Sequence, residues 1–363
     1  MPASGQPQPT AYVNARLLDP ASGLDAKGTL MVVEGRIADL GPHLFAQGVP
    51  PGIQTVDCGG HCLAPGLIDM RVNLREPGEE HKETIETASL AAAAGGVTAM
   101  AALPISEPVA DDVAGLEFVA RRAREVKLVK IYSYGSITKA AEGRELTEFG
   151  LLTKYGAVGF TDDVRPVASA QVMRRALSYA RAFNQVMVQT PQEPELSSGA
   201  MNGGEMATRL GLAGLNPLAE TILLERDIRL AEMTGGRYHA ALISTAESLN
   251  VIRRAKERGL PVTCDTAPHY FTLNELAVGD YRTFAKVMPP LRSEEDRQAV
   301  CAAVADGTID AIASDHSPHD QDSKRQPFAQ AAFGIVGLET LLPLSLALYH
   351  KGEAELLPLL AQL

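Results

Sequence analysis

The feature that most constrains the fold is a long alternation of short apolar runs with amphipathic segments. From Leu63 onward, eight strand-like runs rich in β-branched residues alternate with segments whose apolar residues recur at helical spacing. The predicted strands end at Asn73, Pro104, Gly135, Asp163, Thr190, Thr245, Thr266 and Asp315. Eight such repeats favour an α/β protein, a (β/α)8 TIM-type barrel, over an open doubly wound sheet. No GxGxxG or Walker motif supports a nucleotide-binding alternative.

Three segments are expected along the chain. Residues 1–10 are polar and Pro-rich and predict a flexible tail. Residues 11–62 carry short β-branched runs broken by Gly, Asp and Pro, which predict a small N-terminal β-sandwich segment. Residues 63–363 form the barrel.

Charge and composition exclude several classes of partner. The formal net charge of −11, with no basic run to offset it, argues against binding to nucleic acid or anionic lipid. No stretch approaches the ~20 apolar residues of a membrane span, and no apolar segment follows the N-terminus as in a secretory signal. We therefore expect a cytoplasmic protein. Cys58 and Cys62 flank His61, but no second Cys/His pair lies nearby to complete a zinc site.

A set of sequence blocks resembles one known family. The blocks are PGLIDMRVNLREPGEEHKETIETASLAAAAGGVTAM, VGFTDD, YHAALISTAES, APHYFTL, MPPLRSEEDR, DAIASDHSPH and AAFGIVGLETLLPL. Together they are similar to dihydroorotases of the amidohydrolase superfamily from about Cys62 to the C-terminus. The resemblance implies an amidohydrolase barrel whose chemistry lies at the C-terminal ends of the strands.

The resemblance also implies where a metal site would lie, and several of its ligands are replaced. In the family the first strand ends in His-X-His-Leu-Arg, which supplies two metal ligands on one face of the strand. This chain has Arg71 and Asn73 there; a guanidinium has no acceptor and cannot ligate a metal. Two further histidine positions are occupied by Thr190 and Leu242, while two acidic positions are retained. The six positions of this degenerate metal site are Arg71, Asn73, Asp163, Thr190, Leu242 and Asp315.

The positions that would hold the substrate are altered only in part. Arg75, His319, Phe333 and Gly334 match family residues that hold dihydroorotate, whereas the family's polar residues at two other positions are apolar here. The six positions of this relict substrate pocket are Arg75, Ile105, Met288, His319, Phe333 and Gly334.

These substitutions lead to a functional hypothesis. We expect no catalysis and no cofactor, zinc included, with Asp315 as a relict of the catalytic base. The Arg71 guanidinium is expected to pair with Asp163 and Asp315 and so to neutralise carboxylates that would otherwise be buried alone. The resemblance then points to the non-catalytic dihydroorotase-like chain of bacterial aspartate carbamoyltransferase. It implies a mixed oligomer with the catalytic chain of that enzyme, which belongs to pyrimidine biosynthesis.

Two alternatives stay open. The chain can be a divergent dihydroorotase or related cyclic amidase that works with an incomplete metal site. It can also be a sensor that retains Arg75 for an orotate-like carboxylate. Relatives continue past the eighth barrel helix with strands that return to the sandwich, whereas this sequence stops at LLPLLAQL. We therefore expect the strands of residues 11–62 to leave one edge unpaired.

Overall fold

The computed structural model describes residues 8–363, which fall into two compact units. The larger unit comprises Leu67–Ala354 with Gln362–Leu363. The smaller unit comprises the described residues up to Gly66 with Glu355–Ala361. Most of the tail predicted for residues 1–10 lies outside the described residues.

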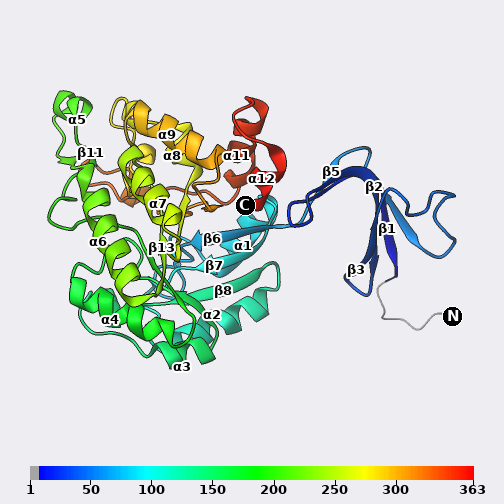
Figure 1. The fold of residues 1–363 in the computed structure, drawn as a ribbon, viewed down its shortest axis with the longest axis horizontal. Helices are drawn as coiled ribbons and strands as arrows, with labels where there is room; N and C mark the ends of the chain where they lie inside the picture. Colours follow the sequence, from blue (N-terminus) through cyan, green and yellow to red (C-terminus); the bar gives the residue numbers. More distant parts are fainter. Residues whose placement is uncertain (1–7) are drawn as a thin grey trace. The chain divides into compact units, whose positions relative to one another are not determined.

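A parallel sheet forms the centre of the larger unit, and β6, β7 and β8 can be followed side by side in Figure 1. Within the described residues it has eight strands: β6 (Leu67–Val72), β7 (Val97–Ala102), β8 (Lys130–Gly135), β9 (Ala157–Phe160), β10 (Val186–Gln189), β13 (Arg237–Ala240), β14 (Val262–Thr266) and β15 (Ala311–Ile312). Val72 pairs in parallel with His316, just beyond β15, so the first and last strands meet and the sheet closes. The predicted (β/α)8 TIM-type barrel is confirmed.

Each barrel strand is followed by a helix before the next barrel strand begins. These helices are α1 (Ile85–Ala94), α2 (Val113–Val126), α3 (Phe149–Lys154), α4 (Ala170–Arg181), α6 (Leu218–Thr234), α7 (Ala246–Glu257), α9 (Glu294–Ala305) and α11 (Leu341–His350). Side chains cap several of them at the first turn; Thr84, Ser169, Thr245 and Ser293 each accept a hydrogen bond from a backbone N–H of their helix. The helices therefore begin where their sequences supply a capping oxygen.

Additional short elements lie in the segments that leave the C-terminal ends of β10, β14 and β15. They are α5 (Glu205–Leu210), α8 (Pro268–Thr272), α10 (Gln321–Lys324), β11 (Met201–Asn202) and β12 (Gly214–Leu215). In a parallel barrel these segments surround the mouth in which ligands bind.

The smaller unit is a sheet with the strand order β3-β2-β1-β4, in which β5 also pairs with β1. Its described elements are β1 (Thr10–Asp19), β2 (Leu24–Val33), β3 (Arg36–Gly41), β4 (Gln54–Asp57), β5 (Cys62–Leu63) and α12 (Leu356–Ala361). β1 is antiparallel to β2 and parallel to β4. Strand β4 was not predicted, because its four residues are all exposed and give no apolar signal.

Across residues 8–363, no helix combines the length and the apolar character needed to cross a membrane.

Candidate active site

The six positions of the degenerate metal site all lie in or just beyond the C-terminal ends of barrel strands. Arg71 is within β6, and the others follow β6, β9, β10, β13 and β15. All six residues are at least nine-tenths buried: Arg71, Asn73, Asp163, Thr190, Leu242 and Asp315. Parallel strands bring these sequence-distant residues to one end of the barrel, which is called the mouth below.

Arg71 forms a buried ion-pair cluster at the centre of the mouth. Its Nε donates to Asp315 Oδ1 at 3.0 Å, and its Nη2 donates to Asp163 Oδ1. Only 2% of the Arg71 side chain is exposed. Burial lowers the pKa of the guanidinium, but Asp163 and Asp315 more than reverse this effect, so the pKa lies above its usual value. The pairing expected from the sequence is present, and Arg71 is a permanent cation.

Asp315 is an acidic group at the mouth with an altered proton affinity. Burial raises its pKa to about 7, although the Arg71 guanidinium opposes the increase. His269 lies nearby, with Nε2 3.9 Å from Asp315 Oδ2. Burial lowers the pKa of His269 to about 3, so this imidazole is neutral at physiological pH. The mouth thus holds a carboxyl group with a pKa near neutrality, which suits a general acid or base, and a neutral imidazole lies beside it.

The backbone at the mouth is strained. Arg75, Asp163, Leu242 and Asp315 have φ values of 59°, 57°, 56° and 52°. Residues other than glycine seldom adopt this left-handed backbone conformation, and each one that does lowers the stability of the fold by about 1–3 kcal/mol. Strain of this kind gathers at functional sites, where the surrounding fold fixes an otherwise unfavourable side-chain direction.

Several buried polar atoms at the mouth have no hydrogen-bonding partner among the described residues. They are Asn73 Oδ1, Thr190 Oγ1, Gln192 Oε1 and His269 Nε2. Buried polar atoms in folded proteins are nearly always paired, so four at one barrel end indicate a surface prepared for a polar ligand or water. These unpaired atoms favour the view that the mouth still binds a polar ligand.

A buried carboxylate holds the loop after β13 in place. Glu220, on α6 and fully buried, accepts hydrogen bonds from the backbone N–H groups of Ser244 and Thr245 at 3.2 and 3.1 Å. Ser244 Oγ also donates to Glu220 at 2.5 Å, and Arg292 Nη2 lies 3.4 Å away. These bonds fix the segment that carries Leu242.

The relict substrate pocket is assembled mainly around Arg75. Its Nε donates to the Pro318 carbonyl at 3.1 Å, its Nη1 lies 3.0 Å from Glu79, and its Nη2 lies 3.3 Å from His319 Nε2. His319 Nε2 is also 2.7 Å from the Phe333 carbonyl, which fixes the proton on that nitrogen, and its Nδ1 has no partner in the described chain. Arg75, His319 and Phe333 are therefore brought together as the resemblance implied.

Gly334 follows Phe333 in the loop after β15, at a position that leaves no room for a side chain. Its φ is 127°, and a Cβ there would meet Ser317 Cβ at 2.7 Å. Ile105 is half-buried, and the space that it shares with Arg75 is reduced to about 10 Å³. Met288 is also half-buried and precedes the loop to α9.

Two lysines that no sequence motif singled out hold the loop after β15. Lys324 Nζ donates to the carbonyls of Ala332 and Gly334, and Lys286 Nζ donates to those of Phe328 and Ala329. Both lysines are buried, and burial lowers the pKa of Lys324 to about 8. The charged composition of segment 320–328 is typical of a solvated loop, yet Lys324 and Phe328 are buried. The charged composition of this segment does not indicate the hydrogen bonds from Lys286 and Lys324 that hold the loop.

Sequence reasoning also missed His269 as a site residue. It lies in APHYFTL, a block that supported the resemblance, but no spacing rule connects it to Asp315, 46 positions later (315 − 269). Its role at the mouth becomes visible only when β14 and β15 are placed side by side.

The residues at the mouth do not fit a metal centre of the family's type. Nowhere in residues 8–363 do three or more His, Cys, Asp or Glu side chains form a group that could hold a metal ion. Asp163 and Asp315 are the two acidic residues of the degenerate metal site, and the Arg71 guanidinium contacts both. A cation in that position repels a second cation.

A closed parallel barrel with polar groups collected at its C-terminal mouth is the architecture of an α/β-barrel enzyme. Comparison of this chain with known proteins specifies the family. Residues 60–248 match the family model described as dihydro-orotase-like. The chain belongs to the dihydroorotase family of the amidohydrolase superfamily.

Individual relatives support this membership. Dihydroorotase from the Wolbachia of Brugia malayi is 46% identical over 356 residues, which cover 97% of this chain and 80% of the relative. Dihydroorotase from Pelobacter propionicus is 47% identical over 93% of this chain and 80% of its own length. Among solved structures, L-hydantoinase (dihydropyrimidinase) from Arthrobacter aurescens superposes with a TM-score of 0.85 at 22% identity, over 97% of this chain and 80% of that one. This likeness supports the fold.

Two expectations from the sequence are corrected by these relatives. The chain was expected not to be an enzyme, but relatives at 46–47% identity over most of its length are named as the enzyme dihydroorotase. The expected absence of a cofactor is contradicted on the same ground, because the family's pattern serves metal-dependent hydrolysis. Replacement of the metal-binding histidines is therefore not sufficient evidence that activity is lost.

Proposed function

We propose that the chain is a divergent hydrolase of cyclic amides of the dihydroorotate class in pyrimidine biosynthesis, in which the family's metal site is only partly retained. The observation that carries the proposal is Asp315. It combines burial, a strained backbone and a pKa raised to about 7 at the mouth of the barrel. The names of the relatives support the same reaction class.

Asp315 takes the role of general base. In its ionised form it accepts a proton from the water that attacks the amide carbonyl, and the C–N bond then breaks as the leaving nitrogen takes up a proton. A carboxyl group with a pKa near 7 is poised to give and to take this proton at physiological pH.

Arg71 supplies fixed positive charge beside the base. Its Nε and Nη2 are used by the two carboxylates, while Nη1 donates to no protein acceptor in the described chain. We assign that N–H to the carbonyl oxygen of the substrate, on which negative charge develops during attack. Because the mouth residues do not fit a metal centre, no step is assigned to a metal.

The test is an assay of the full chain for dihydroorotate hydrolysis and for its reverse, with and without added zinc. Asp315→Asn is expected to abolish turnover, whereas the exposed Asp306→Asn serves as the matched control and keeps it. Absence of turnover in the unmodified chain under both conditions would refute the proposal.

Association with the catalytic chain of aspartate carbamoyltransferase remains a proposal of its own, independent of activity. It rests on the resemblance in the Arg71 and Asn73 region, with the cytoplasm as the proposed location. Co-expression followed by size-exclusion chromatography tests it: a mixed oligomer supports the association, and separate elution of the two chains contradicts it.

A further inference from the structure

A cavity of about 360 Å³ lies at the end of the barrel opposite the mouth, near the starts of the strands. Ile68, Tyr132 and Val158 mark its entrance, since they lie near the starts of β6, β8 and β9 and each is at least two-fifths exposed. Twelve side chains from seven strands line it: Ile68, Met70, Met100, Ala101, Tyr132, Tyr134, Val158, Val186, Val188, Arg237, His239 and Thr263. The cavity is therefore distinct from the mouth, where the site described above lies.

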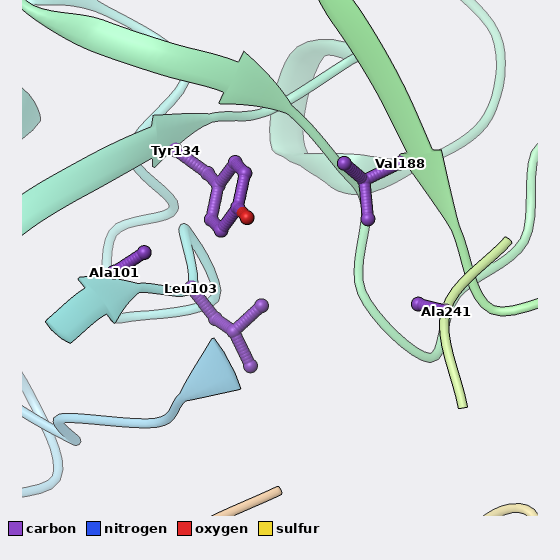
Figure 2. Packing of buried hydrophobic residues seen from close by; sticks show 5 residues of the cluster. All are labelled: Ala101, Leu103, Tyr134, Val188 and Ala241. Atoms are coloured by element: carbon purple, nitrogen blue, oxygen red, sulfur yellow. The ribbon is translucent and has the colours of Figure 1, made fainter. Parts of the chain in front are cut away.

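The walls are mainly apolar, and small side chains leave the axis of the barrel open. Ala101 and Val188 belong to the interior cluster drawn in Figure 2, in which the Tyr134 ring extends from β8 toward the middle. Apolar cavities of about 300 Å³ or more are the usual size for small organic ligands. A molecule built on one aromatic ring matches this volume and lining.

The polar groups in the wall show what such a ligand must carry. His239 is already satisfied, with Nδ1 2.8 Å from Thr263 Oγ1 and Nε2 3.0 Å from Asp265. The Tyr134 hydroxyl is different: the residue is 5% exposed, and its oxygen bonds to no other group in the described chain. Figure 2 shows this oxygen pointing toward the middle of the cluster, where Val188 lines the cavity, whereas Leu103 and Ala241 lie outside its lining. A phenol that lines a cavity can donate its O–H to a bound molecule, so an acceptor on the ligand suits it.

Arg237 provides a charge at the entrance. It is the first residue of β13, its side chain lines the cavity, and its Nη1 donates to the Asn184 carbonyl at 3.0 Å. Within residues 8–363 it forms no ion pair with a carboxylate, unlike Arg253 or Arg258. A guanidinium without an acidic partner beside an apolar cavity favours a ligand carboxylate.

We propose that this end of the barrel is a binding site for a small aromatic carboxylate. The ring fills the space between Ala101 and Val188, the carboxylate pairs with Arg237 at the entrance, and a polar substituent at the inner end accepts from the Tyr134 hydroxyl. The proposed ligand and its entrance differ from those of the mouth, and Tyr134 lies between the cavity and the small space beside Arg75 and Ile105.

The test uses 4-bromobenzoate and 4-acetylbenzoate as probes on the full chain. Saturation-transfer NMR and calorimetry are expected to show millimolar or tighter binding that dihydroorotate does not displace. Bromine anomalous scattering from a crystal soaked with 4-bromobenzoate is expected to place the atom within the cavity. No binding at about 5 mM, or a bromine located at the mouth, would overturn the proposal.

Variants identify the contacts. Arg237→Gln is expected to weaken binding of both probes about tenfold, and Arg254→Gln, an exposed arginine on α7, is the unchanged control. Tyr134→Phe removes only the hydroxyl and is expected to weaken 4-acetylbenzoate more than 4-bromobenzoate. Ala101→Leu fills the cavity and is expected to abolish binding. Unmodified affinity in Arg237→Gln and Tyr134→Phe would refute the assigned contacts even if Ala101→Leu does not fold.

Discussion

Replacement of Arg71 by methionine would remove the central cation of the barrel mouth while keeping most of the side-chain length. Two buried carboxylates, Asp163 and Asp315, would then lose their shared partner. Removing one member of a buried ion pair typically costs about 3–5 kcal/mol, because the remaining charge stays desolvated. We expect a loss of this size in the free energy of unfolding at pH 8. The exposed arginine of the Arg253–Asp306 pair gives the matched control, and Arg253→Met should cost about 1 kcal/mol or less.

The loss caused by Arg71→Met should depend on pH. The folded-state pKa of Asp315 is raised to about 7 from 3.8, so the folded protein binds this proton more tightly than the unfolded chain. The contribution of Asp315 to stability is therefore largest below about pH 4 and decreases as the pH rises toward 7. The Arg71 charge lowers the pKa of Asp315, so without it this pKa is higher still. The free energy of unfolding then continues to fall to a higher pH. The difference between Arg71→Met and the unmodified chain should be smaller at pH 5 than at pH 8.

The assay is urea unfolding at pH 5 and pH 8, followed by far-UV circular dichroism because the chain has no tryptophan. A cost below about 0.5 kcal/mol at pH 8 would refute the view that Arg71 stabilises buried carboxylates. A cost equal at both pH values would refute the assigned role of Asp315 ionisation.

Three further predictions follow from the same geometry. If Asp315 is the base, the kcat/KM of the unmodified chain should rise with pH and level off above about 7, and Asp315→Asn should lower kcat by about 10²–10⁴-fold; a flat profile would contradict the assignment. Glu220→Gln should cost about 3 kcal/mol in urea unfolding, since an amide cannot accept all the bonds from Ser244 and Thr245; a change below about 0.5 kcal/mol would show that these bonds are dispensable. Lys324→Met should accelerate amide hydrogen exchange in residues 328–334, with exposed Lys351→Met as the control, and equal exchange in both variants would exclude a loop-holding role.

Local sequence patterns were sufficient for the elements of the barrel. The sequence predicted eight strands alternating with helical segments, and the structure contains eight barrel strands with a helix after each. Strand β4 was missed because its residues are exposed and carry no alternation. The resemblance to dihydroorotases, together with the rule that ligands gather at the C-terminal ends of parallel strands, predicted that Arg71, Asp163 and Asp315 lie together.

The sequence by itself therefore determined the barrel, the family and the positions that border its mouth, since these depend on periodicity and on motifs within short segments. Only the tertiary structure decided which polar atoms remain unpaired, that His269 lies beside Asp315, and that two lysines fix the loop after β15. It also revealed the cavity beneath Tyr134. The physical reason is that burial, hydrogen-bond satisfaction and pKa depend on neighbours from distant strands, which become neighbours only when the barrel closes.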